Sequence, residues 1–91
     1  MGSVVIVYKI FPKEVIDNFD PLKKKIEKTL PEFASVRGYG EEPIAFGLKA
    51  LLVQITFPED KTGILEELEK KLESMNEISQ VQTVMVRRTS R

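Results

Sequence analysis

Hydrophobic residues form short dense runs in parts of this chain and recur at helical spacing in others. Residues 3–11 are rich in β-branched and aromatic side chains and too few for a helix of this content, so they predict a first strand. Residues 22–30 repeat a large aliphatic side chain at every fourth position, which predicts an amphipathic helix. Asp20 and Pro21 suit its start, with Asp20 as the cap, and Pro31 ends it.

The second half of the chain repeats these patterns. Residues 48–57 alternate large apolar side chains on one face and are partly apolar on the other, as in a strand near the middle of a sheet. Residues 65–75 predict a second amphipathic helix, capped by Asp60 or Thr62, and residues 78–86 predict a last strand. The apolar positions of the helix are Leu65, Leu68, Leu72 and Met75. In the last strand, one face is expected to carry Val81, Thr83 and Met85, and the other Gln80, Gln82, Val84 and Val86.

Residues 34–43 are less regular than the runs on either side. Val36 and Tyr39 suggest a short or irregular strand. Gly38 and Gly40 imply a bulge or a close approach of the backbone.

The predicted elements follow the order strand, helix, strand, strand, helix, strand. Two crossovers of helical length place both helices on one face of a four-stranded antiparallel sheet. The sequence therefore predicts an α+β fold, a ferredoxin-like β-α-β-β-α-β sandwich, in a single domain of residues 1–91.

The composition narrows the classes of function. Fourteen basic and fourteen acidic residues cancel, which argues against a nucleic-acid binder that works through bulk charge. The chain has no cysteine and no histidine, so it has no disulfides, thiolate nucleophiles, imidazole bases or common zinc ligands. No apolar run approaches the roughly 20 residues that cross a bilayer. We expect a soluble, cytoplasmic protein with no membrane partner.

The carboxylates do not predict a catalytic or metal site. Glu41 and Glu42 are adjacent, and neighbours on an extended chain point to opposite sides. We therefore expect no catalytic residues, no enzyme activity, no metal and no cofactor. Ferredoxin-like sheets also bind RNA through exposed aromatic rings, so a ribosomal or RNA-associated binding module is the alternative. Tyr8 is the single candidate ring, and we interpret it as a packing residue of the sheet, so no direct nucleic-acid partner is expected.

Residues 42–51 place a large apolar ring, Phe46, beside a glycine. A ring at a turn leaves apolar area in water, which folding alone does not favour. Either the ring folds back over the end of the sheet as part of the core, or it is an anchor that enters a partner's pocket. Gly47 favours a tight turn that holds the ring outward, and Pro43 stiffens the approach. Lys49 is a solvated charge within reach of the same rim.

Arg87, Arg88 and Arg91 follow the predicted last strand. Basic residues at a chain end usually serve solubility, but these leave a strand at a fixed place on the domain. We expect the end of that strand to lie at the same edge of the sheet as the connection that carries Phe46. The arginines and the ring would then share one surface.

The segment around Phe46 resembles the carboxyl-terminal exchange domain of the elongation factor 1-beta family, and in particular its short archaeal form. The matching positions are Pro43, Phe46, Gly47, Leu48, Lys49 and Leu51, followed by an acidic turn at residues 59–63. The resemblance covers nearly the whole chain in length and element order. Ala45 stands where the eukaryotic relatives have a glycine.

This resemblance implies a guanine-nucleotide exchange factor that promotes GDP release and GTP loading on elongation factor 1-alpha. It implies a role in binding, by a chain that acts alone, and we expect a monomer. In the eukaryotic relatives the aromatic ring enters the GTPase, and a lysine near the carboxyl end disturbs the magnesium and phosphate site. The residues expected at the GTPase contact are Phe46, Gly47, Ala45, Lys49, Arg87 and Arg88. Either Arg87, or Arg88, or neither takes the place of that lysine.

Overall fold

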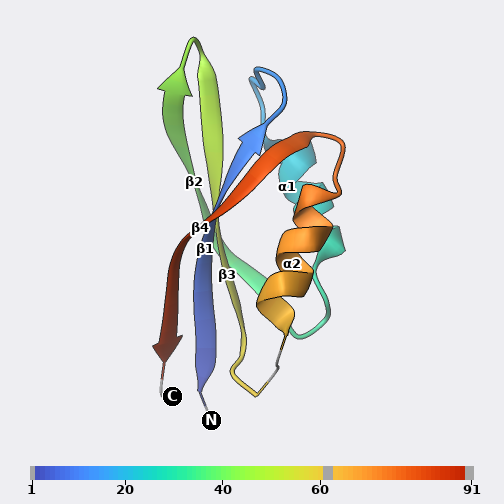
Figure 1. Cartoon of the computed structure of the whole chain (residues 1–91), viewed down its shortest axis with the longest axis vertical. Coiled ribbons are helices and arrows are strands. Elements are labelled where there is room, and N and C mark those ends of the chain that lie inside the picture. The colour runs from blue at the N-terminus through green and yellow to red at the C-terminus, as the bar shows by residue number, and fades with distance from the viewer. Residues whose placement is uncertain (1, 61–62, 90–91) are drawn as a thin grey trace.

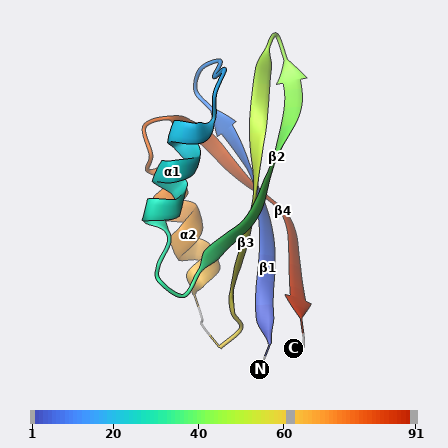
Figure 2. The same cartoon turned by 180° about the vertical axis from the view of Figure 1, so that it is seen from behind.

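A computed structural model describes residues 2–60 and 63–89 of the chain (Figure 1). Its elements are β1 (Ser3–Pro12), α1 (Asp20–Thr29), β2 (Ser35–Ala45), β3 (Leu48–Pro58), α2 (Ile64–Glu73) and β4 (Ile78–Thr89). The strands form one antiparallel sheet in the order β2-β3-β1-β4. Both helices cover one face of this sheet and leave the other, the open face, uncovered (Figures 1 and 2). The predicted ferredoxin-like fold is confirmed.

The core lies between the sheet and the two helices. Ile26 of α1 and Leu72 of α2 are fully buried against the apolar face of β1 and β3. Tyr8 of β1 is also fully buried, and its hydroxyl donates a hydrogen bond of 3.2 Å to the backbone carbonyl oxygen of Leu65. Tyr8 therefore packs inside the domain, as the sequence interpretation expected, and its hydrogen bond also holds α2 to the sheet.

Both helices begin differently from the prediction. The residue before α1 is Phe19, and the side-chain oxygen of Asn18 accepts a hydrogen bond of 3.0 Å from the backbone N–H of Asp20. Asp20 is thus the first helical residue, and the expectation that it caps the helix is wrong. Gly63, in the left-handed conformation, precedes α2, so Asp60 is not the cap of that helix. The alternative cap, Thr62, lies outside the described residues.

The buried stripe of α2 differs from the predicted one at its first position, whereas the predicted burial of Leu68 and Leu72 is confirmed. Ile64, Leu68 and Leu72 are buried and follow each other at intervals of four. Leu65, which was expected to belong to the apolar face, is exposed. Because α2 begins at Ile64, this residue occupies the core position of the first turn.

β2 is a long edge strand, although the sequence suggested a short or irregular one. The expected bulge is present, because the pairing with β3 shifts between Val36 and Gly38. Pro43, which was expected to stiffen the approach to the turn, lies inside β2 and pairs with Lys49. An edge strand tolerates proline because the side that lacks the N–H faces solvent.

β4 contains a bulge that reverses its faces. Val7 pairs with Met85 and Tyr8 with Thr83, so Val84 is the extra residue. Thr83 therefore lies on the helix-covered face and Met85 on the open face, and the expectation that they share a face is wrong.

Candidate partner-binding site

A two-residue turn joins β2 to β3 and carries Phe46 at its tip. The φ angles of Phe46 and Gly47 are +53° and +80°, the pattern of a type I′ hairpin turn, whose twist matches that of the strands. The Phe46 side chain is 97% exposed. The ring therefore points into solvent, and the alternative in which it packs against the core is wrong.

Folding does not favour phenylalanine at this position. A left-handed backbone costs a residue with a side chain roughly 1–2 kcal/mol, which is why glycine and asparagine dominate such turns. The exposed ring recovers almost nothing of this cost through burial. An unfavourable backbone conformation that presents an exposed apolar ring is a physical indication of a binding site.

The strands behind the tip form an arm that is braced on both faces. Ile10 of β1 pairs with Leu51, and residues 48–50 continue beyond this pair with β2 (Figure 1). The Lys49 ammonium lies 3.7 Å from a carboxylate oxygen of Glu41, and Lys9 forms an ion pair with Glu42. Ion pairs this exposed contribute about 0–1 kcal/mol each, so they orient the arm more than they stabilise the fold. Lys49, expected as a solvated charge, is therefore part of the brace.

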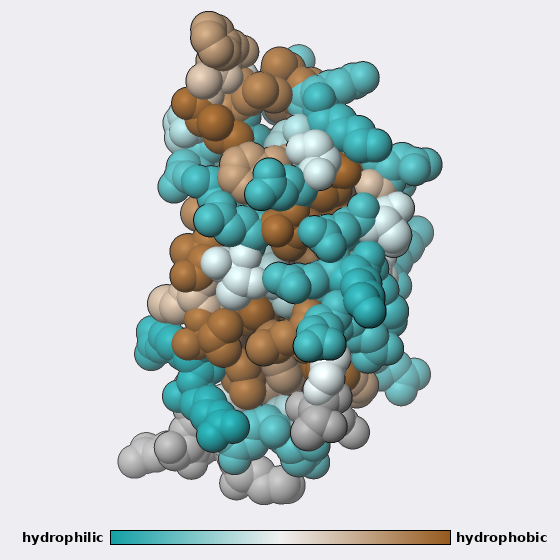
Figure 3. All heavy atoms as spheres, viewed as in Figure 1, coloured by the Kyte–Doolittle hydropathy of each residue, from teal (hydrophilic) through white to brown (hydrophobic). Residues whose placement is uncertain are grey.

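A run of exposed apolar side chains lies along the end of β4, on both faces of the sheet, and the sequence analysis missed it. Val84, Met85 and Val86 are exposed by 54%, 38% and 47%. The space-filling view shows hydrophobic atoms both at the hairpin end and in the lower half of the molecule (Figure 3). These three residues looked like part of a buried strand because their types are typical of strand interiors. The predicted topology could have indicated their exposure, since it makes the last strand an edge strand.

The two arginines and Phe46 lie at opposite ends of the domain, so the expectation that they share one surface is wrong. β4 is antiparallel to β1 and therefore ends where β1 begins, whereas the β2–β3 turn lies where β1 ends. Arg88 pairs with Val4, which also pairs with Phe57, nine residues along β3 from Leu48. At about 3.3 Å per residue this places the two ends about 30 Å apart.

Arg87 and Arg88 also lie on different faces of the sheet. Arg88 lines a hollow beside the start of α2, together with Leu65 and Val86. Arg87 pairs with Val5 on the open face. Both belong to β4, which was predicted to end at residue 86, so they are held by strand pairing.

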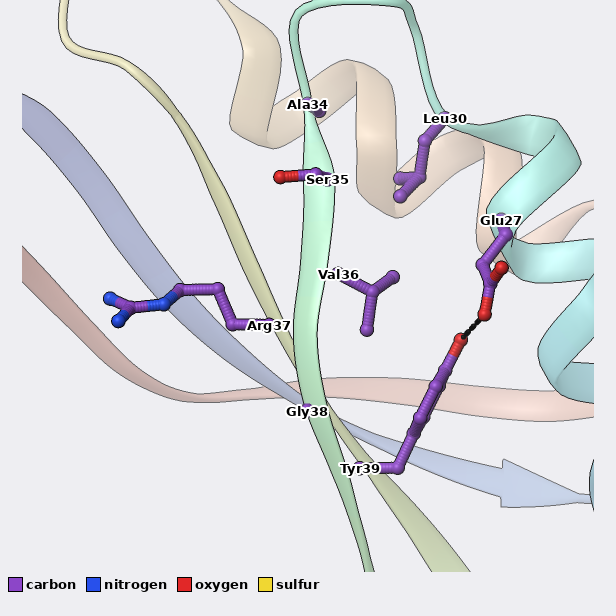
Figure 4. A pocket seen from close by; sticks show the side chains of 8 residues that line it. All are labelled: Glu27, Leu30, Ala34, Ser35, Val36, Arg37, Gly38 and Tyr39. Atoms are coloured by element: carbon purple, nitrogen blue, oxygen red, sulfur yellow. Dashed lines mark hydrogen bonds between the residues drawn. The ribbon is translucent and has the colours of Figure 1, made fainter.

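The hollow between α1 and β2 has a structural explanation (Figure 4). The Tyr39 hydroxyl donates a hydrogen bond of 2.6 Å to a carboxylate oxygen of Glu27, and the Lys23 ammonium lies 4.9 Å from the centre of the Tyr39 ring. Burial, and then the hydrogen bond to Glu27 and the charge of that carboxylate, raise the pKa of Tyr39, which therefore remains a donor. Leu30 and Val36 line the hollow beside this pair (Figure 4). The contacts hold the base of β2 against α1.

Within residues 2–60 and 63–89, no three acidic side chains gather as a metal site would require. In the same part of the chain, no helix is long and apolar enough to cross a membrane. The features that folding leaves unexplained are thus surfaces: an exposed ring on a braced arm, and an apolar strand end beside two arginines.

The fold and these surfaces define a small domain that acts through binding. A family model described as the EF-1 guanine nucleotide exchange domain matches residues 5–91. The chain belongs to this family, and it is a guanine-nucleotide exchange factor of translation elongation with a GTPase as its partner. The resemblance found in the sequence is thereby confirmed.

Relatives named elongation factor 1-beta are similar to this chain over almost their whole length. The protein of Staphylothermus marinus is 41% identical over 88 residues, which cover 97% of this chain and 98% of the relative. That of Thermofilum pendens is 40% identical over 90 residues, 99% of each chain. Among solved structures, the C-terminal domain of MgtC from Mycobacterium tuberculosis has a TM-score of 0.59 at 13% identity and covers 90% of this chain and 85% of its own. BlrP1 BLUF has a TM-score of 0.59 at 17% identity and covers 100% of this chain and 57% of its own. These two likenesses concern the fold alone.

Proposed function

We propose that this chain releases GDP from elongation factor 1-alpha in the cytoplasm, as a monomer, with Phe46 as the anchor that enters the GTPase. The chain works by binding, makes and breaks no covalent bond, and needs no cofactor. The single observation that carries the proposal is the 97% exposed ring on a left-handed turn. Membership of an exchange-factor family supports a GTPase as the partner whose pocket receives the Phe46 ring.

Exchange requires the factor to bind the empty GTPase more tightly than the GDP-bound one. A translational GTPase holds GDP through its phosphates and a bridging magnesium ion. By thermodynamic reciprocity, a partner that prefers the empty form weakens GDP binding by the same factor. A thousandfold faster release corresponds to a barrier lowered by about 4 kcal/mol. One well-packed aromatic anchor is able to supply a difference of this size.

The remaining candidate contacts have distinct roles in this proposal. Gly47 keeps the turn tight, Ala45 leaves room beside the ring, and Lys49 lies at the rim of the tip. Arg87 and Arg88 form a second contact about 30 Å away, at ~3.3 Å per strand residue. The ring and the arginines therefore touch different parts of the GTPase, as a standard interface of ~800 Å² per partner allows.

The test is the release of fluorescent GDP from purified elongation factor 1-alpha. We expect Phe46→Ala to slow the stimulated release at least a hundredfold and to leave the thermal melt unchanged, because the ring makes almost no contact within the domain. Val15→Ala, which shortens another exposed apolar side chain, is the control and should exchange normally. Normal exchange by Phe46→Ala would remove the ring from the mechanism.

The second contact has its own control. Arg87→Ala with Arg88→Ala should weaken stimulated release about tenfold. Lys24→Ala with Lys28→Ala removes the same charge from the exposed side of α1 and should have little effect. An equal loss in both double variants would mean that only overall charge matters.

A further inference from the structure

The open face carries a shallow hollow halfway along the sheet, with a volume of about 250 Å³. Its lining comes from Val7 of β1, from Leu52 and Gln54 of β3, and from Gly38, Tyr39 and Gly40 of β2. The two glycines bring no side chain to this face, so the Leu52 side chain beside Gly40 is left partly exposed.

The fold itself does not require glycine at position 40. Positive φ angles among the glycines occur at Gly47 and Gly63, so the backbone of Gly40 is open to other residues. A Cβ atom there would lie 3.6 Å from Leu52, which is ordinary contact distance. Gly38 follows the bulge at Arg37, which accounts for a glycine there. Gly40 pairs with Leu52, and glycine inside a strand costs about 0.5–1 kcal/mol relative to alanine.

The open face also connects the two ends of the proposed interface. Arg87 pairs with Val5 and Met85 with Val7, so both lie on this face. The hairpin tip projects at the other end, and α1 and α2 cover the opposite face (Figure 2). One partner that touches both Phe46 and Arg87 therefore runs along the open face and passes over the hollow.

We propose that the open face is the body of the interface with the GTPase, and that an apolar side chain of the GTPase fills the hollow at Gly40. Leu52 and Val7 provide apolar contact for this side chain, and Gln54 offers an amide at the edge. Arg87 is the basic residue that the open face brings to this interface, whereas Arg88 lies on the other face of the sheet. This inference rests on the proposed exchange function.

The test is the concentration of exchange factor that gives half-maximal GDP release, measured with Gly40→Val and Gly40→Ala. A β-branched residue suits a strand, so we expect Gly40→Val to melt no lower than the wild type. It should raise the half-saturating concentration at least tenfold, and Gly40→Ala severalfold. Arg87→Ala should raise it about tenfold, and Lys24→Ala, the matched control at an exposed position of α1, less than twofold. Should Gly40→Val fold poorly, Gly40→Ala and the comparison of Arg87→Ala with Lys24→Ala decide.

The outcomes separate the two proposals. If the wild type does not accelerate GDP release, the exchange proposal and the open-face proposal are both wrong. If the wild type is active and the Gly40 variants have unchanged half-saturation, the open face is not the interface, although the exchange function stands. The open face is likewise excluded if Lys24→Ala is as damaging as Arg87→Ala. A parallel titration with labelled single-stranded RNA tests whether RNA, and not the GTPase, occupies the hollow. Loss of RNA affinity in Gly40→Val with normal exchange would overturn the assignment of the hollow to the GTPase.

Discussion

Replacing Phe46 by asparagine should make this domain more stable and at the same time inactive. The turn holds residue 46 in the left-handed region, at a φ of +53°, where Asn-Gly is the favoured pair of a type I′ turn. This conformation costs phenylalanine roughly 1–2 kcal/mol, and it costs asparagine less because its short polar side chain bonds locally. With the ring 97% exposed, the substitution loses almost no buried area. We expect a gain of about 1 kcal/mol, which for a domain of this size raises Tm by about 4–8 °C.

Thermal unfolding followed by circular dichroism measures this gain, and fluorescent GDP release measures the loss of exchange. Phe46→Ala is the reference, because alanine carries the same left-handed cost as phenylalanine and should not change Tm. A lower Tm for Phe46→Asn would mean that the ring packs against the domain in solution. Retained exchange would show that the strained ring has no role in binding.

Two further predictions concern the support of the arm and the core. Because burial and Glu27 raise the pKa of Tyr39 above 10, the unfolded chain releases the phenol proton first, so this stabilisation is complete below pH 10 and is lost as the pH rises further. Tyr39→Phe should therefore lower the free energy of unfolding by about 0.5–1.5 kcal/mol at pH 8, measured by denaturant titration. At pH 11 the loss should be smaller. An equal loss at both pH values would contradict this reasoning. Ile55→Ala, at a fully buried position of β3, should cost about 2–5 kcal/mol in the same assay, and a loss below 1 kcal/mol would show that the core collapses around the gap.

The sequence predicted the fold because its strongest signals agree with the final packing. The apolar runs of β1 and β3 and the four-residue spacing of α1 lie at the centre of the core, where burial and periodicity coincide. The errors lie where one residue changes a local geometry. The bulge at Val84 reverses the faces of β4, and no feature of its strand-forming neighbours reveals it. The residue that caps α2 is a left-handed glycine, Gly63, whereas the polar residues before it led to the prediction of a side-chain cap.

The candidate site was predicted in part. Phe46 was identified because an apolar ring beside a glycine has no reason in folding alone, and its exposure agrees with this argument. Placing Arg87 beside it was a topological error, since antiparallel pairing with β1 carries the end of β4 to the opposite end of the sheet. The apolar run at residues 84–86 was missed because composition alone does not separate an edge strand from a buried one.

The separation of the two ends leads to a last prediction, on how their variants combine. Changes more than 7–10 Å apart that share no partner group add in free energy within about 0.3–0.5 kcal/mol, or roughly a factor of two. Phe46 and Arg87 are about 30 Å apart by strand length, so the fold-losses in half-saturation should multiply when Phe46→Ala and Arg87→Ala are combined. The four proteins of this cycle are compared in one GDP-release titration. If the double variant is no worse than Phe46→Ala alone, Arg87 reaches the GTPase only after the ring has docked, and the two ends do not contribute independently to binding.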